Sequence, residues 1–174
     1  MESDNNELYS RPVLEFVTMG AEFCKTLESC SKMPRARFVD VMCGLLPMVY
    51  LKATLLPAFH ETAGYNAPCV TEEDYNYVRN NVAAVMGEED DFLDVFTEDF
   101  KYSDQPVRCT ISENLADMYQ SLRDFVEVVR AGYDEAVEAA LHDIQSQFET
   151  SWGQKAVNAL RALHDIRMKL KYGA

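Results

Sequence analysis

Apolar residues recur at helical spacing along most of the chain, and no segment shows the alternation typical of a strand. Residues 11–29 oppose an apolar stripe to a polar face and predict a first amphipathic helix. A second helix is predicted over about 34–56. Its apolar stripe stays in phase across Pro47, which falls on the opposite side, and so indicates one kinked helix; the stripe consists of Phe38, Val41, Met42, Leu45, Val49 and Leu56. Residues 1–9 are polar and predict a flexible lead-in to a single helical domain over 10–172.

The stretch Val41–Phe59 contains only one charged residue, Lys52, and must be either a buried helix or a membrane span. A lysine near the centre of a span costs about 3 kcal/mol on insertion scales, and Gly44 and Pro47 weaken a span further. We therefore expect no membrane association. The stretch instead predicts a central helix that the other helices surround.

The middle of the chain begins with a helix-capping pattern. Thr71 and Asp74 have the spacing of a capping box, and Gly87 is placed to close the helix that they open. Residues 88–104 are acidic but include four large apolar side chains, so they predict either a short helix or an ordered loop held by aromatic residues.

Three further helices are expected in the last third of the chain. Thr110 or Ser112 caps the first of them, and Gly132 either ends it or softens a longer rod. The last helix begins near Trp152. The predicted fold class is therefore all-α, a single-domain bundle of six or seven helices around the helix at about 34–56.

Composition narrows the class of partner. The 174 residues are 48% hydrophobic and have a formal net charge of −13. This charge argues against nucleic acid and against anionic membrane surfaces, and it favours a basic protein partner. The acids concentrate in residues 88–104, whereas 151–174 is basic and could neutralise them. The candidate partner-binding residues are Glu88, Glu89, Asp90 and Asp91.

The five cysteines are odd in number and scattered, with no CxxC pair. This pattern predicts free thiols, and free thiols indicate a reducing compartment. The first residues are acidic and polar and do not have the character of a signal peptide. We therefore expect a soluble, cytoplasmic protein.

Two features of the sequence are candidates for a functional site. Lys52 falls on the predicted core stripe, where it must pair with an acid, lose its proton or extend its stem to solvent. An acidic strip runs opposite the apolar face of the helix after Ser112, and a metal, a basic partner, the C-terminal bases or solvent alone could face it. The strip consists of Glu113, Asp117, Gln120 and Asp124.

Known catalytic patterns are matched only in part. Glu135 and Glu138 form one half of the all-α nucleotide pyrophosphatase pattern, but the second half is missing downstream. The Glu-x-x-His pairs of a di-iron bundle are absent. The order of histidine–aspartate phosphohydrolases recurs with the wrong spacing in His60, His142-Asp143 and Asp165. The sequence therefore predicts no catalytic residue, metal site or cofactor.

Three segments together resemble an uncharacterised family of short bacterial proteins, a domain of unknown function seen in Bacteroides-like bacteria. They are Leu46–Ala53, Glu113–Gln120, and Trp152-Gly153 with Ala159–His164. The resemblance would span about Leu8 to Tyr172, and it implies a helical bacterial protein with no assigned activity.

The sequence thus leaves the function unknown and supports two hypotheses. The first is a non-enzymatic protein-binding module that meets a basic partner through 88–104. The second is a small-molecule or metal-binding bundle, possibly hydrolytic, with a site near Lys52. Its other candidate binding residues are Asp117, Trp152 and His164, although Trp152 equally suits a corner filled by packing.

Overall fold

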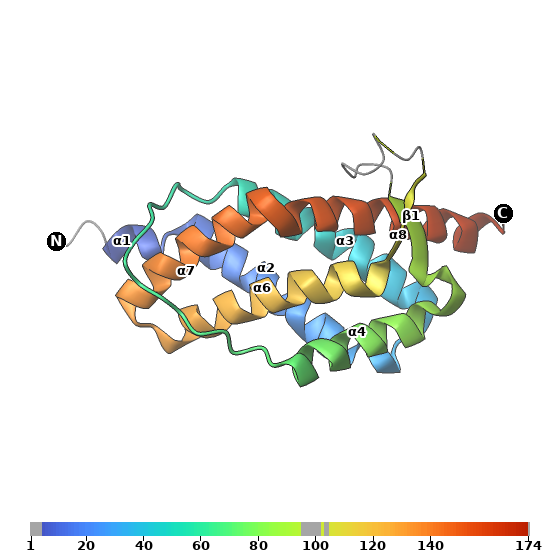
Figure 1. Ribbon diagram of the computed structural model, residues 1–174, viewed down its shortest axis with the longest axis horizontal. Helices are drawn as coiled ribbons and strands as arrows, with labels where there is room; N and C mark the ends of the chain where they lie inside the picture. Colours follow the sequence, from blue (N-terminus) through green and yellow to red (C-terminus); the bar gives the residue numbers. More distant parts are fainter. Residues whose placement is uncertain (1–4, 95–101, 103–104, 174) are drawn as a thin grey trace.

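The computed structural model describes residues 5–94, 102 and 105–173. Within these ranges the chain forms one mostly helical bundle (Figure 1). Its long helices are α2 (Arg11–Ser29), α3 (Arg35–Thr54), α4 (Glu72–Met86), α6 (Ile111–Ala131), α7 (Asp134–Gln147) and α8 (Gly153–Tyr172). Short helical turns are α1 (Asn5–Leu8), η1 (Cys30–Lys32), η2 (Gly87–Asp90) and η3 (Phe148–Trp152).

A small β-hairpin corrects the all-α prediction. Strands β1 (Asp91–Asp94) and β2 (Val107–Thr110) pair antiparallel, with Asp91 opposite Thr110. The acidic stretch therefore starts as a turn and a strand. Its continuation at 95–101 and 103–104 lies outside the described residues.

The central helix is α6, and not the helix predicted over about 34–56. Helix α6 contacts α2, α4, α7 and α8, and it runs through the middle of the bundle (Figure 1). Helix α3 packs mainly on α2 and α8, so its other side is open. A helix that is apolar nearly all round can lie in the core, but it can equally lie at the edge of the bundle if its exposed face binds a partner.

The buried side of α3 differs slightly from the predicted stripe. Leu46 and Ala53 are buried, whereas Val41, Leu45 and Leu56 are only half-buried. The helix continues through Pro47, which lies on the exposed side as expected. None of the described helices combines the length and the apolar character that a membrane crossing requires.

Residues 5–9, which the sequence assigned to a flexible lead-in, contact the bundle. Leu8, in α1, is buried in the core, and the hydroxyl of Tyr9 donates a hydrogen bond to Asp134 at 3.0 Å. Burial of one apolar side chain and this hydrogen bond fix the chain against α7 before α2 begins.

The predicted caps are present. Thr71 and Asp74 form a reciprocal capping box at the start of α4. Thr110 is the N-cap of α6, because its hydroxyl accepts a hydrogen bond from the backbone N–H of Glu113 at 3.1 Å. Gly132 has a positive φ of 74° and ends α6, so α6 and α7 are separate helices.

Helices α7 and α8 join through the π-helical turn η3 into one helical rod. The backbone N–H of Gly153 bonds to the carbonyl of Phe148, five residues earlier. A Cβ atom on Gly153 would lie 2.5 Å from that same carbonyl oxygen. The turn therefore requires glycine at this position.

Replacing Gly153 with alanine is expected to lower the free energy of unfolding by about 1–2 kcal/mol, because the added methyl group meets backbone that cannot move away. Alanine normally stabilises a helix interior relative to glycine by about 1 kcal/mol. Gly20→Ala is the matched control, since its Cβ would make only ordinary contact with Val126 at 3.5 Å. Urea denaturation should give opposite signs for the two variants, and a stabilising Gly153→Ala would contradict the steric account.

Candidate functional site

Lys52 pairs with an acid, one of the three outcomes that its position left open. Its Nζ lies 2.7 Å from Oε2 of Glu15 on α2, and its side chain is 19% exposed. Glu15 also pairs with Arg11. The hydrogen bond from Lys52, followed by that from Arg11, lowers the pKa of the Glu15 carboxyl. The lysine therefore takes part in an ion pair between α2 and α3.

Asp117 joins three helices. Its carboxylate accepts a hydrogen bond from the hydroxyl of Tyr75 on α4 at 2.7 Å and pairs with Lys155 on α8. Burial, followed by this hydrogen bond, raises the pKa of Tyr75. The sequence left open what faces the acidic strip. For Asp117 it is Lys155, one of the chain's own C-terminal bases. These contacts fasten α4 and α8 to α6.

Trp152 is a core residue. It is 1% exposed and stacks on Phe16 with ring centroids 6.2 Å apart. Its indole N–H donates to the carbonyl of Ile144 at 3.2 Å. His164, by contrast, is exposed on α8. In the described part of the chain, no hydrogen bond or ion pair links any two of the four residues proposed around Lys52.

The four candidate partner-binding acids, residues 88–91, divide into two pairs. Asp90 is buried and accepts hydrogen bonds from the backbone N–H of Ser112 at 2.8 Å and from its hydroxyl at 2.6 Å. Asp91 pairs with Arg108 across the hairpin. These two residues therefore serve the fold, while Glu88 is exposed and Glu89 is half-buried.

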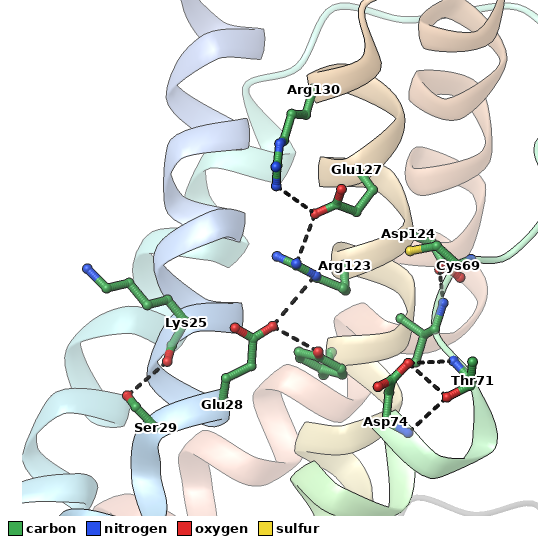
Figure 2. A network of polar contacts seen from close by, with 12 residues as sticks. Lys25, Glu28, Ser29, Cys69, Thr71, Asp74, Arg123, Asp124, Glu127 and Arg130 are labelled. Atoms are coloured by element: carbon green, nitrogen blue, oxygen red, sulfur yellow. Dashed lines mark hydrogen bonds and ion pairs between the residues drawn. The ribbon is translucent and has the colours of Figure 1, made fainter.

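A polar network connects α2 to α6 (Figure 2). The guanidinium of Arg123 lies between Glu28, at 3.6 Å, and Glu127, at 2.9 Å. Arg130 also pairs with Glu127, and the hydroxyl of Tyr119 donates to Glu28. Two carboxylates thus face two guanidinium groups, and this balance is typical of a structural network.

The loop before α4 is held by Asp124, the last member of the acidic strip. Its carboxylate accepts hydrogen bonds from the backbone N–H groups of Cys69 and Val70 at 2.8 and 2.9 Å (Figure 2). A cavity of about 260 Å³ lies beside it, between this loop, α6 and α7. Its volume is below the range of about 300–1,000 Å³ usual for ligand pockets, and Asp124 is already satisfied.

The described residues offer little for metal or thiol chemistry. Among them, no group of three or more His, Cys, Asp or Glu side chains is placed to hold a metal ion. All five cysteines are free. Burial raises the pKa of Cys30 to about 11 and, together with Asp124, that of Cys69 to about 12. Thiols with such pKa values stay protonated and are poor nucleophiles.

The open side of α3 is the largest feature that internal contacts leave unexplained. Met48, Leu51 and Leu55 are 41%, 49% and 52% exposed. Together with Val41 and Gly44 they are spaced by three and four residues in turn, the spacing of a coiled-coil seam. We call this set, with its exposed neighbours Tyr50 on α3, Leu14 on α2 and Val157 on α8, the α3 surface.

Gly44 lies in the middle of the seam. A Cβ atom built there meets nothing within 4 Å. Glycine in an exposed helix interior costs roughly 0.5–1 kcal/mol relative to alanine, and no contact within the described chain requires it here. The position therefore suits the close approach of a partner's backbone or side chain.

Two apolar grooves flank the seam. One, of about 350 Å³, lies between α2 and α3, and includes Leu14, Met19 and Met48. The other, of about 290 Å³, lies between α3 and α8, and includes Leu51 and Val157. Helices pack by placing the ridges of one into the grooves of the other, so a ridge between two grooves is a surface that another helix can pack against.

The α3 surface groups several exposed apolar residues. Its six most exposed residues present roughly 500 Å² in total, within the range of the largest patches on monomers, which are often functional. Charges beside it are neutralised internally, since Lys52 pairs with Glu15 and Asp40 with Arg167. Covering the surface would therefore leave no charge unpaired at these two places. The sequence analysis missed this surface, although its heptad spacing around Gly44 is visible in the sequence.

Comparison with known proteins agrees with the resemblance noted in the sequence. Residues 7–169 match a sequence family described as a domain of unknown function, DUF5063. The crystal structure of protein BF1032 from Bacteroides fragilis is 39% identical, with a TM-score of 0.81. The match covers 92% of this chain and 94% of that one. No curated protein matches the chain.

Proposed function

The chain belongs to the DUF5063 family, whose description gives no activity, and from that premise we propose that it is a non-enzymatic protein-binding module. Its binding site is the α3 surface, and the occupant is the apolar face of an α-helix. The exposed heptad-spaced seam with an open glycine at its centre is the observation that supports this proposal most directly.

The other features of the chain fit this role. Lys52, Asp117 and Asp90 are engaged in ion pairs and in a hydrogen bond at the start of α6, and the thiols are held protonated. Five free cysteines support a reducing compartment, the cytoplasm, as its location. Exposed Glu88 and half-buried Glu89 are a second candidate contact, for a basic segment of a partner.

Affinity capture from a lysate of its own cells, quantified by mass spectrometry, tests the proposal. We expect Leu51→Arg to reduce recovery of the specific partner by about tenfold or more, because it places a charge in the apolar contact. A synthetic peptide of the partner's helix should then bind the wild-type chain and not the variant.

Two further baits make this result specific. Tyr65→Arg is the control, since it adds the same charge at an exposed position outside the α3 surface. A bait with Glu88→Gln and Glu89→Gln tests the acidic contact separately. Equal recovery by wild type and Leu51→Arg would contradict the α3 surface as the binding site, and loss only in the neutralised bait would assign binding to the acids.

A further inference from the structure

The α3 surface is complementary to itself. Leu51 is 49% exposed on the seam, and Gly44, two helical turns earlier, has no side chain and only open space where a Cβ atom would lie. If two α3 helices cross antiparallel about a twofold axis near Met48, Leu51 of each copy faces Gly44 of the other. Val41 then faces Leu55, and Met48 faces its own counterpart. A twofold interface needs this reciprocity, in which each residue meets its partner twice.

From this self-complementarity we propose that the helix bound by the α3 surface is α3 of a second copy of this chain, in an antiparallel homodimer. The inference rests on the proposed function and names its partner.

The available area agrees with a stable dimer. A standard interface buries about 800 Å² on each partner, and interfaces are roughly 60% apolar. The six exposed residues of the α3 surface would supply roughly 500 Å² of the area on each copy, the larger part of a standard interface.

Charge does not oppose the pairing locally. Helix α3 has three bases, Arg35, Arg37 and Lys52, and one acid, Asp40. The acids that produce the net charge of −13 lie mainly on other segments. At physiological ionic strength, charges more than about 8 Å apart across solvent are largely screened. Two copies can therefore approach on this side despite their like net charges.

Sedimentation velocity of the full chain tests the state of association. The wild type should sediment as a dimer of the 19.8 kDa chain. Leu51→Arg should raise the dissociation constant on the order of a hundredfold, since the change occurs twice in one interface. Gly44→Leu should also raise the dissociation constant, because its side chain fills the open space at Gly44. Its circular dichroism should stay that of a folded chain, because the position is open. Tyr65→Arg should remain a dimer.

Disulfide trapping tests the geometry, in a background with Cys43, Cys69 and Cys109 changed to serine. Met48→Cys should form a covalent dimer on mild oxidation, because the two copies meet at the axis. Leu55→Cys, on the same exposed face, should not, since antiparallel pairing separates the two positions by about 21 Å along the helices. Efficient trapping of both variants would indicate parallel pairing and overturn the proposed arrangement.

The outcomes separate this inference from the proposed function. A wild-type chain that is monomeric, yet captures a partner lost in Leu51→Arg, would overturn the homodimer and leave the function standing. A monomeric chain with no such partner would overturn both. A dimer unaffected by Leu51→Arg and Gly44→Leu would place the contact elsewhere and overturn the inference.

Discussion

Replacing Trp152 with alanine is expected to lower the free energy of unfolding by about 3–5 kcal/mol. The side chain is 1% exposed and lies between the rings of Phe16 and Phe148. Its removal leaves a cavity where α2 meets the π turn, and it also removes the hydrogen bond to the carbonyl of Ile144. Urea denaturation followed by far-ultraviolet circular dichroism measures this loss.

Trp152→Phe separates packing from hydrogen bonding at this position. Phenylalanine keeps an aromatic ring against Phe16 but has no N–H group, so we expect a smaller loss of about 1–2 kcal/mol. The structural role of the residue would be disproved by an alanine variant within about 1 kcal/mol of the wild type. Such a result would reopen the possibility that the tryptophan serves a ligand.

Asp90→Ala is expected to lower the free energy of unfolding by about 2–3 kcal/mol. The carboxylate accepts two hydrogen bonds from buried Ser112, one from its backbone N–H and one from its hydroxyl. Without Asp90 this backbone donor has no partner at the start of α6, the helix on which most of the bundle packs. Denaturant unfolding again provides the measurement.

Glu88→Ala is the matched control for Asp90. Glu88 lies two residues away in the same acidic run but is exposed, so we expect a change within about 0.5 kcal/mol. Similar losses in the two variants would show that general charge, and not a specific contact with Ser112, determines the effect. Asp90→Asn should fall between them, because an amide oxygen can still accept one of the hydrogen bonds.

Local signals predicted much of the helical framework. The amphipathic stripe over 11–29 coincides with α2, because every fourth or third position faces one core. The capping box at Thr71 and the glycine at 132 mark helix ends through backbone hydrogen bonding and backbone conformation. Such signals depend on residues close in sequence, so they can be recognised without knowledge of the tertiary structure.

The hairpin and the centre of the bundle depend on distant contacts. Strands β1 and β2 have only four residues each, too few for a periodic signal. Twelve residues separate them, so the sequence does not show that they pair. Helix α3 is apolar on most sides, so its predicted stripe only approximated the buried face, and Leu46 and Ala53 are buried outside it. Only the packing of α2 and α8 on it decides which face is buried.

The site residues show the same division. The sequence left open whether Lys52 pairs with an acid, loses its proton or extends to solvent, and Glu15 could be identified as its partner only when α2 and α3 were placed together. The acids at 88–91 formed a uniform run in sequence. The structure separates them, because Asp90 alone reaches the start of α6.

The π turn between α7 and α8 contains one residue more than a regular helix would place there. Buried positions from the turn onward, such as Trp152, Ala156 and Leu163, accordingly fall about one residue later than the spacing of α7 would place them. Deleting a single residue in this turn would restore a regular helix but rotate everything downstream by about 100°. Helix α8 would then present its apolar stripe to water, so side chains can vary here far more easily than length.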